Sequence, residues 1–516
     1  MPSAAGVYHE LTSYSAERHW FLPAPDPRIR QDFLPMVGSQ RPSPLKYFDS
    51  SLPTISLPTS WPVGPASPHA LAGLARGSRL DIRLADLARM LFCSCGVMRT
   101  TEQSEPLAPG RTAWRWFRTV SSAGGCHPLE VYVCAISVTG LDDGIWHYEP
   151  FDHSLTLICP EARSACASLV VTGIPWRTTW RYAERGYRHL WWDAGTMTAN
   201  LLAAASSAGL PATVRLGFPD HQIASLVGAV APSELPLAVV ILGQGELPGA
   251  TASRAVRGDV GSDPESFPLI VSTHQESCLR DEVAVRRWCE PPGQLADVPG
   301  HPPAELPKSI DEVIVARGSH RRFDPGHRVP ASLMLWALGI AAATPPWDAG
   351  QSLIEVDVIA HDVGGLSPGL YAWQADAMRL VRAGADRQET RLLCLDQAAA
   401  AGASAVLVCS VDLESAIAMR GERGYRSIQF AAGLSIGRLY LALSSVRLGC
   451  CALTCNDEWF HRLVAPRRAA LLSLALGMPH GGSRARPAVA GRPRLAGLTG
   501  AAEQVISHVL DQVADE

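Results

Sequence analysis

Arg317, Ser319 and Arg321 alternate along one short segment of the chain. Alternating residues in a loop or at the start of a helix can converge on one anion. Each guanidinium can donate two parallel hydrogen bonds to a phosphate, and the hydroxyl adds a further donor. The spacing therefore predicts a phosphate-binding site. The alternative is the start of a helix whose arginines are simply solvated.

Ser122, Ala123 and Gly124 form a second candidate site, inside a run of small residues that leads into an apolar segment. Small side chains allow the backbone to approach a flat ligand closely. The run therefore predicts a binding surface for a planar group, and the alternative is an ordinary turn.

Motifs of several other enzyme classes are missing from the sequence. Gly243-Gln244-Gly245 lacks the third glycine of a dinucleotide-binding fingerprint, and there is no Walker A motif, nucleophile elbow or zinc-protease motif. The 13 cysteines are irregularly spaced, which favours reduced, buried thiols over a disulfide framework or structural zinc. We therefore expect no metal site.

Composition excludes several further classes. A net charge of −4 argues against a nucleic-acid-binding surface. No apolar run approaches the roughly 20 residues that span a bilayer, and the N-terminus does not have the pattern of a secretory signal. We expect a cytoplasmic protein without nucleic-acid or membrane partners, and 516 residues are enough for two or three domains.

The elements that must position these residues are arranged as an internal repeat. Four sequence blocks recur in the same order and at a nearly constant separation, which indicates a duplication. The blocks are Arg76-Gly77-Ser78 with Arg317-Gly318-Ser319, Leu129-Glu130-Val131 with Ile354-Glu355-Val356, Gly140-Leu141 with Gly365-Leu366, and Glu184-Arg185-Gly186-Tyr187-Arg188 with Glu422-Arg423-Gly424-Tyr425-Arg426.

Each copy predicts the same order of elements. An apolar-periodic helix follows the Arg-Gly-Ser block, two alternating strands come next, and Glu-Arg-Gly-Tyr-Arg opens a long helix before a last apolar strand. The predicted fold class is α+β, with an antiparallel-rich sheet wrapped by helices in each copy. The long helices are expected at about 190–208 and 428–448, and the last strands at 236–242 and 471–476.

The repeat also predicts the domain organisation. Two domains are flanked by Pro-rich or loop-like segments, and the segment between them holds one helical stretch, from Asp281 to Cys289. The expected parts are an irregular N-terminal segment 1–60, domain one 61–248, a linker 249–305, domain two 306–498 and a C-terminal helix 499–516.

The two copies have diverged in complementary ways. Domain two keeps the full alternating Arg-Ser-Arg set, whereas domain one keeps only Arg76 and Ser78, with Leu80 in place of the last arginine. Domain one keeps the small-residue loop, whereas the corresponding segment of domain two, 347–351, contains Trp347 and Asp348.

Several further motifs lie in the first copy and in the segment that precedes it. They include Tyr8-His9-Glu10, Leu45-Lys46-Tyr47, Ser122-Ala123-Gly124 with Pro128-Leu129-Glu130-Val131, His147-Tyr148, Tyr182 with Glu184-Arg185-Gly186-Tyr187-Arg188, Asp193-Ala194-Gly195 and Asn200-Leu201. In these motifs the chain resembles the SagB-type peptide dehydrogenases. These are nitroreductase-fold flavoproteins that oxidise thiazolines and oxazolines in ribosomally made peptides to thiazoles and oxazoles. The resemblance is clear over about 8–240 and weaker over about 308–490.

The resemblance implies two tandem nitroreductase-like domains that form a pseudo-dimer within one chain, with FMN at their interface. In that family one subunit grips the phosphate and the other supplies the small-residue loop. One composite site is then intact, and we expect one FMN per chain. Its residues are Arg317, Ser319, Arg321 and Arg486 from domain two, with Ser122, Ala123 and Gly124 from domain one. If each repeat bound its own flavin instead, Arg76 and Ser78 would belong to the second phosphate-binding site.

The resemblance also implies catalytic residues. The family places a Lys-Tyr pair before Gly-Glu-Arg-Gly-Tyr-Arg, and Arg181-Tyr182 stands at that place here. Tyr182 is the expected base, with a packed aromatic residue as the alternative. Arg181 cannot act as a base because its pKa is too high, but it can position a carbonyl or stabilise negative charge.

The implied function is an FMN-dependent dehydrogenase that oxidises azoline rings to azoles in a modified precursor peptide. Its expected partner is the cyclodehydratase of the same pathway, and further oligomerisation stays open. The alternatives are an FMN oxidoreductase acting on a carrier-bound or small-molecule substrate, and a flavin-free scaffold subunit of a peptide-modifying complex.

Overall fold

A computed structural model provides the structure of the chain. It describes residues 3–20, 26–38, 41–104, 112–161, 166–249, 255–261, 264–291, 298, 302, 305–374 and 377–480. Arg486 and the C-terminal helix expected at 499–516 lie outside the described residues.

Domain one is built on an antiparallel sheet whose strands follow the order β1-β6-β5-β4-β7-β9-β8. The first and last strands of the predicted repeat are buried along their whole length: β4 is the middle strand, and β9 lies next to the edge strand β8. The strands are β1 (Thr54–Ser56), β4 (Leu129–Ala135), β5 (Gly144–Glu149), β6 (Ser154–Cys159), β7 (Ser168–Gly173), β8 (Ala212–Arg215) and β9 (Leu235–Leu242).

Domain two repeats this sheet in the order β14-β13-β11-β15-β17-β16, again with antiparallel pairing throughout the described strands. The sheet has no counterpart of β1 among the described residues, so β14 forms its edge. The strands are β11 (Glu355–Ala360), β13 (Gly369–Gln374), β14 (Ala377–Ala383), β15 (Ala405–Val411), β16 (Gly449–Leu453) and β17 (Ala469–Gly477).

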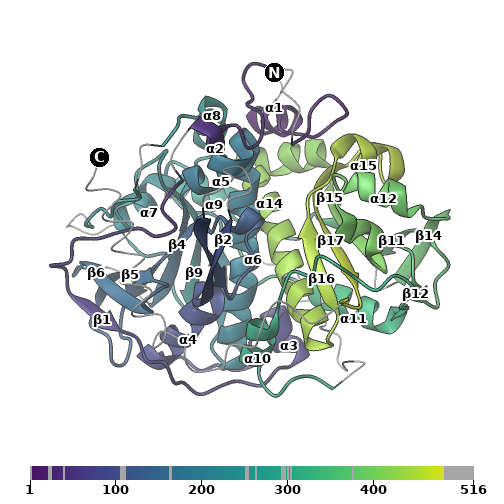
Figure 1. The fold of residues 1–516 in the computed structure, drawn as a ribbon. Helices are drawn as coiled ribbons and strands as arrows, with labels where there is room; N and C mark the ends of the chain where they lie inside the picture. The colour runs from purple at the N-terminus through teal and green to yellow at the C-terminus, as the bar shows by residue number, and fades with distance from the viewer. Residues whose placement is uncertain are drawn as a thin grey trace.

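The two long helices, α6 (Gly186–Ser207) and α14 (Leu413–Ser445), lie side by side between the two sheets (Figure 1). Small residues allow their backbones to touch. A Cβ added at Gly195 would lie 2.2 Å from the Phe430 carbonyl oxygen, and one at Gly433 would lie 2.3 Å from the Trp192 carbonyl oxygen. The helix pair is therefore the interface of a pseudo-dimer within one chain, and the predicted tandem α+β fold is confirmed.

The remaining helices cover the outer faces and the ends of the helix pair. Two of them, α4 and α11, stand where the apolar periodicity predicts them, and α9 falls in the predicted helical stretch of the linker. The helices are α1 (Ala4–Leu11), α2 (Pro35–Gly38), α3 (Pro68–Ala72), α4 (Leu84–Cys95), α5 (Pro175–Tyr182), α7 (Asp220–Leu226), α8 (Pro268–Glu276), α9 (Glu282–Trp288), α10 (Ile310–Ala316), α11 (Ala331–Ala342), α12 (Arg387–Leu393), α13 (Ala398–Gly402) and α15 (Asp457–Leu463).

Two separate pairs of strands complete the described structure. The strand pair β2 (Val97–Ser104) and β3 (Thr112–Arg118) is antiparallel, and β10 (Val329–Pro330) pairs in parallel with β12 (Val363–Gly364). All 13 cysteines are free thiols, as their spacing predicts. Among the described residues, no helix is long and apolar enough to cross a membrane.

The segment 1–60 was expected to be irregular, but it begins with the helix α1. Ser3 caps the helix by accepting from the Gly6 amide, and Glu422 accepts hydrogen bonds from the Ala4 and Ala5 amides at 3.1 and 2.7 Å. Because Glu422 is more than 400 residues away in the sequence, local sequence patterns do not reveal this second cap.

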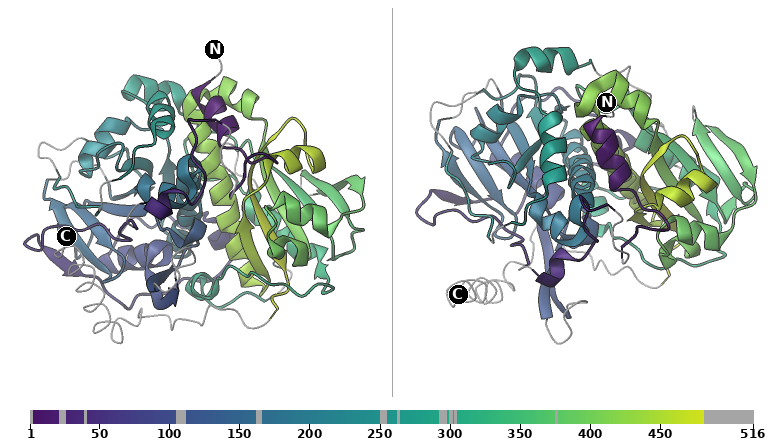
Figure 2. Two further views of the ribbon diagram at one scale, coloured as in Figure 1. Left: turned by 45° about the horizontal axis from the view of Figure 1, so that its top comes forward. Right: turned by 90° about the horizontal axis from the view of Figure 1, so that it is seen from above.

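Helix α8 in the linker repeats α1. Arg188 donates to the His9 carbonyl and to the Thr12 hydroxyl after α1, and Arg426 donates to the His274 carbonyl and to the Ser277 hydroxyl after α8. The two helices lie together at one end of the pair formed by α6 and α14 (Figure 2). The Glu-Arg-Gly-Tyr-Arg motif of each copy therefore anchors the helix that precedes that copy.

Candidate functional site

The segment that carries Arg317, Ser319 and Arg321 runs in extended form beside β16. Ser319 forms a parallel β-bridge with Cys450, and the His320 amide donates to the Cys450 carbonyl at 2.9 Å. Ser319 and Arg321 are exposed, and the Ser319 hydroxyl lies 3.0 Å from the Tyr440 hydroxyl. The alternating residues therefore lie along an extended segment at the edge of the domain-two sheet, and not at the start of a helix.

Arg317 is a buried cation at the interface between the domains. Its side chain is 6% exposed, its Nε donates to the Thr119 carbonyl of domain one at 3.2 Å, and its guanidinium lies 5.3 Å from the Tyr440 ring centre. Among the described residues, no ion pair joins Arg317 to a carboxylate, and burial lowers the pKa of its guanidinium. A buried charge without a protein counter-ion suits a site for an anionic ligand, so a phosphate fits here.

The contact with Thr119 brings this segment to the small-residue loop, because Thr119 stands three residues before Ser122. The Ser122 hydroxyl donates to the Asp193 carboxylate of α6, and the Ala123 amide donates to the same carboxylate at 3.1 Å. Gly124 has a φ of 60°, in the left-handed region. Residues from both domains therefore meet at one place, as the composite site requires.

Arg181 and Tyr182 lie against the same loop from the end of α5. Arg181 donates through Nη1 to the Gly124 carbonyl at 3.1 Å. A Cβ added at Gly124 would lie 2.5 Å from the Tyr182 hydroxyl. The structure thus places the two expected catalytic residues beside the loop that is expected to hold the planar ligand.

Tyr182 is stacked face to face on His189, with ring centres 4.1 Å apart and planes 5° apart. Burial raises the pKa of the Tyr182 phenol well above its usual value and lowers the pKa of the His189 imidazole. Tyr182 is therefore a neutral phenol at pH 7. The nearby Arg181 guanidinium acts in the opposite direction, because its charge favours the phenolate.

Asp193 is a functional candidate that sequence reasoning did not single out for a role. It lies one helical turn after His189 in α6, and burial raises the pKa of its carboxyl to about 7, although the Ser122 hydrogen bond acts against this rise. Such a group can hold or release a proton near neutral pH. In the sequence, the signal that could have identified Asp193 was a carboxyl group in the middle of an otherwise buried helix.

The second, pseudo-symmetric site is not assembled in this way. Arg76 and Ser78 are exposed, whereas Trp347 and Asp348 of the facing loop are buried. Domain one covers that loop, since the Val214 amide donates to the Pro346 carbonyl and two further amides, of Leu216 and Gly217, donate to Asp348.

A larger side chain also fills the space at this second position. Arg438 occupies the position in domain two that Asn200 occupies in domain one. It donates a hydrogen bond to the Ala343 carbonyl and is 1% exposed. Its burial lowers its pKa to about 9. The two halves of the second site therefore do not form an accessible ligand surface among the described residues.

One further cluster has the composition of a metal site. Ligand atoms of Asp220, His274 and Cys278 lie within 4.8 Å of one another. Arg423 and Arg426 each approach the Asp220 carboxylate at 2.6 Å and hold its pKa well below its usual range. Two guanidinium groups at the carboxylate oppose binding of a cation, so the cluster serves to anchor α8.

The comparisons with known proteins agree with this architecture. A model of the nitroreductase family matches residues 107–244. A protein of Methanocaldococcus jannaschii described as a nitroreductase is 30% identical over 179 residues, which are 32% of this chain and 81% of that protein.

One solved structure shows the same fold over most of the chain. A nitroreductase structure from Anabaena variabilis superposes with a TM-score of 0.68 at 22% identity, and the match covers 93% of this chain and 100% of that chain. A chain of the E. coli microcin synthetase McbBCD complex with truncated pro-MccB17 matches 32% of this chain and 65% of its own length, at a TM-score of 0.26 and 19% identity.

The Anabaena match extends over both sheets and the helix pair between them, so the tandem arrangement also occurs in that solved structure. The Methanocaldococcus relative is matched over most of its own length. Together with the internal repeat, these matches show that the chain belongs to the nitroreductase family and consists of two tandem nitroreductase-like domains that form a pseudo-dimer.

Proposed function

We propose that the chain binds one FMN between its domains and oxidises azoline rings to azoles in a ribosomally made peptide. The observation that carries the cofactor proposal is the buried Arg317 guanidinium, which has no carboxylate partner among the described residues and contacts Thr119 next to the small-residue loop. The substrate class rests on the resemblance of the sequence motifs to the azoline-oxidising family.

The residues of domain two hold the phosphate in this proposal. Arg317 supplies a desolvated charge, and Ser319 and Arg321 supply exposed donors from the same extended segment. Arg486 is proposed as a fourth donor and lies outside the described residues. Ser122, Ala123 and Gly124 of domain one support the ring system, which when bound would accept a hydride from the substrate.

The residues beside the loop handle the proton and the peptide. Arg181 keeps a fixed positive charge at the Gly124 carbonyl, where it orients a peptide carbonyl of the substrate. Tyr182, as its phenolate, takes the proton from the alpha carbon of the azoline, which is a ring carbon, and the adjacent ring carbon gives up the hydride. Burial opposes the phenolate that this role needs, and the Arg181 guanidinium favours it. His189 fixes the plane of the Tyr182 ring by stacking.

The proposed substrate determines the preceding reaction. An azoline arises when a Cys, Ser or Thr side chain condenses with the preceding peptide carbonyl and water is lost. A cyclodehydratase is therefore the proposed partner, and the modified precursor peptide is the proposed substrate. The domain limits 61–248 and 306–498 are part of the same proposal.

The flavin content of purified protein tests the cofactor site. We expect Arg317→Ala to weaken FMN binding roughly 10- to 100-fold, because a hydrogen bond to a charged group contributes about 1.5–3 kcal/mol. Arg76→Ala is the matched control and should keep the wild-type flavin content, because Arg76 is exposed in the copy whose site is covered. Equal loss in both variants would contradict the composite site.

A second assay tests the reaction. The flavin-loaded protein is incubated in air with a synthetic peptide that contains one thiazoline, and mass spectrometry follows the loss of two hydrogens. Azole formation supports the proposal. Bound flavin that oxidises only free small molecules favours the alternative oxidoreductase, and a protein that never takes up FMN favours the scaffold.

A further inference from the structure

The segment between α1 and α2 is docked on the turn that carries Tyr182. The Phe33 amide donates to the Arg181 carbonyl at 2.6 Å, and the Arg30 amide donates to Glu184 Oε2 at 2.7 Å. The two acceptors lie on either side of Tyr182 in the sequence. The N-terminal segment is therefore fixed across the turn that presents the expected base.

Phe33 is held at this place by a buried anchor. The preceding residue, Asp32, is 2% exposed, accepts a hydrogen bond from the Tyr14 hydroxyl and lies 3.7 Å from the Arg18 guanidinium. Phe33 itself has a φ of 65°, which a residue other than glycine adopts only at a cost. The anchor and the bond to the turn maintain this conformation, so the position of the Phe33 ring is well defined.

Two aromatic side chains of this segment form a surface beside Tyr182. The Phe33 ring centre lies 6.1 Å from that of Tyr182, with the planes 59° apart. The Trp20 ring meets the Phe33 ring edge to face, with centres 6.1 Å apart. Both Trp20 and Phe33 are half-buried, so part of each ring stays accessible. We call these two residues the aromatic wall.

Domain two has an equivalent turn, and an aromatic residue of the preceding segment reaches it as well. Gly421 has a positive φ, as Ala183 has at the equivalent position of domain one. The Trp288 indole Nε1 donates to the Arg420 carbonyl in this turn at 3.1 Å. The segment that precedes each copy therefore places an aromatic side chain at the turn before the long helix.

The two segments differ in what they do at the neighbouring loop. In domain two the linker continues onto the loop, because the Glu290 amide donates to the Asp348 carbonyl at 2.9 Å and a Cβ added at Gly350 would meet the Glu290 carboxylate. In domain one, the atoms nearest to a Cβ at Gly124 belong to the two expected catalytic residues. The linker thus covers the loop of domain two, whereas the aromatic wall stands beside the loop of domain one.

We propose that Phe33 and Trp20 determine substrate specificity by packing against a planar side chain or ring next to the azoline of the peptide. This inference rests on the proposed function and adds a feature of the substrate. Neighbouring residues of a peptide are about 3.8 Å apart, so the neighbour of a ring that reaches Tyr182 also reaches Phe33. Aromatic rings gain from such contacts beyond the burial of their area.

Three synthetic peptides with one thiazoline test the preference. One has Ala on both sides of the ring, one has Phe before it and one has Phe after it. We expect one of the two Phe peptides to show a kcat/KM roughly tenfold above that of the Ala peptide, through a lower KM. Fluorescein-labelled forms of the peptides are also titrated with the flavin-loaded protein, and anisotropy reports binding without turnover.

Three variants assign the preference to the aromatic wall. Phe33→Gly removes the ring at a backbone conformation that suits glycine, and it should abolish the preference for the Phe peptide. Phe33→Tyr keeps a ring and should keep the preference. Leu34→Ala is the matched control, because Leu34 is an adjacent apolar residue that is 52% exposed, and it should behave as the wild type.

The outcomes separate this inference from the proposed reaction. Equal binding of the three peptides, no binding at all, or a preference that survives in Phe33→Gly would overturn the specificity proposal. An equal fall in kcat with all peptides and an unchanged preference would show that Phe33 only supports Tyr182, which also overturns it. A binding preference that Phe33→Gly abolishes, in a protein that oxidises none of the peptides, would uphold the aromatic wall and contradict azoline oxidation.

Discussion

Asp193 shows how a single buried carboxyl links the stability of the site to pH. Its pKa is raised to about 7 by burial, from an ordinary value of 3.8. Between these values the unfolded chain loses the proton while the folded chain keeps it. Asp193 therefore destabilises the fold progressively as pH rises through this window, relative to a residue that does not ionise.

Asp193→Asn removes this ionisation and keeps a polar side chain next to Ser122. We expect the unfolding free energy of the variant to rise relative to the wild type by on the order of 3 kcal/mol between about pH 4 and 7. Denaturant unfolding of both proteins across this range measures the difference. If the unfolding free energies of the two proteins changed with pH in the same way, the pKa of Asp193 would not be raised.

The loop that carries Ser122, Ala123 and Gly124 is the element on which the site depends. Two consecutive glycines, Gly124 and Gly125, have φ values of 60° and 67°. Only the first faces the site, since a Cβ at Gly124 meets the Tyr182 hydroxyl and a Cβ at Gly125 meets nothing within 4 Å. Both positions therefore have a backbone conformation that favours glycine, but only at Gly124 would a larger side chain meet a neighbouring side chain.

Gly124→Ala and Gly125→Ala therefore form a matched pair. Both should cost about 1 kcal/mol of stability, because an alanine is strained at positive φ. Only Gly124→Ala should also displace Tyr182 and reduce flavin content and turnover. Thermal unfolding and flavin absorbance report the two effects separately, and an equal flavin loss in both variants would assign the effect to backbone strain.

The helix pair α6 and α14 holds the two halves of the site together. Arg317 and Thr119 belong to different domains, so their contact depends on how closely these helices approach. Gly433 sets that approach, because its Cα faces the backbone of Trp192.

Gly433→Ala should destabilise the protein by about 1–3 kcal/mol, because the added methyl group meets backbone that cannot move aside. Ser435→Ala in the same helix is the control, and we expect it to change stability by less than about 0.5 kcal/mol. Denaturant unfolding measures both. If Gly433→Ala unfolded at the same denaturant midpoint as the wild type, the helices could move apart without loss of stability.

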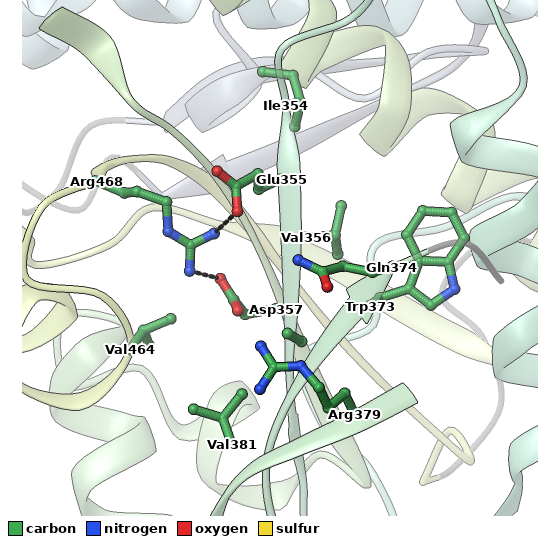
Figure 3. Close-up of a pocket in the computed structure, with 11 residues that line it drawn as sticks. Ile354, Glu355, Val356, Asp357, Trp373, Gln374, Arg379, Val381, Val464 and Arg468 are labelled. Carbon is green, nitrogen blue, oxygen red and sulfur yellow. Dashed lines mark hydrogen bonds and ion pairs between the residues drawn. The ribbon is translucent and has the colours of Figure 1, made fainter. Parts of the chain in front are cut away.

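At the scale of the whole molecule, the two copies differ at the place where the composite ligand site is proposed. The first site joins Arg317 with an accessible loop, and the second pairs the exposed Arg76 with a loop whose Trp347 is buried. The asymmetry extends to the outer faces. In domain one Lys46 and Phe48 pack against Tyr132 and His147, whereas the sheet of domain two carries a cavity of about 410 Å³ (Figure 3).

We expect one FMN per chain at saturation. Native mass spectrometry of the flavin-loaded protein measures this ratio directly, and Arg317→Ala should shift the distribution to the flavin-free chain. Two flavins per chain would show that the copy containing Arg76 and Ser78 also forms a site, and the asymmetry argument would then be wrong.

The sequence by itself determined the repeat, the α+β class, the last strands and the approximate position of α6. The second long helix differs from the prediction of 428–448, because α14 begins at Leu413 and is interrupted at Gly421, where φ is 63°. The features that the sequence determined rest on local apolar periodicity and on motifs that recur within the chain, such as Glu184–Arg188 and Glu422–Arg426. The sequence also singled out Arg317, Ser319 and Arg321, because their spacing alone suits an anion. Their role stays a prediction.

Only the tertiary structure decided which residues meet. The helix α1 depends on Glu422, and the neighbourhood of Arg317 depends on Thr119, in both cases across the domain interface. The raised pKa of Asp193 has the same origin. Burial, loss of water and missing counter-charges are properties of the space around a side chain, and segments distant in the sequence build that space.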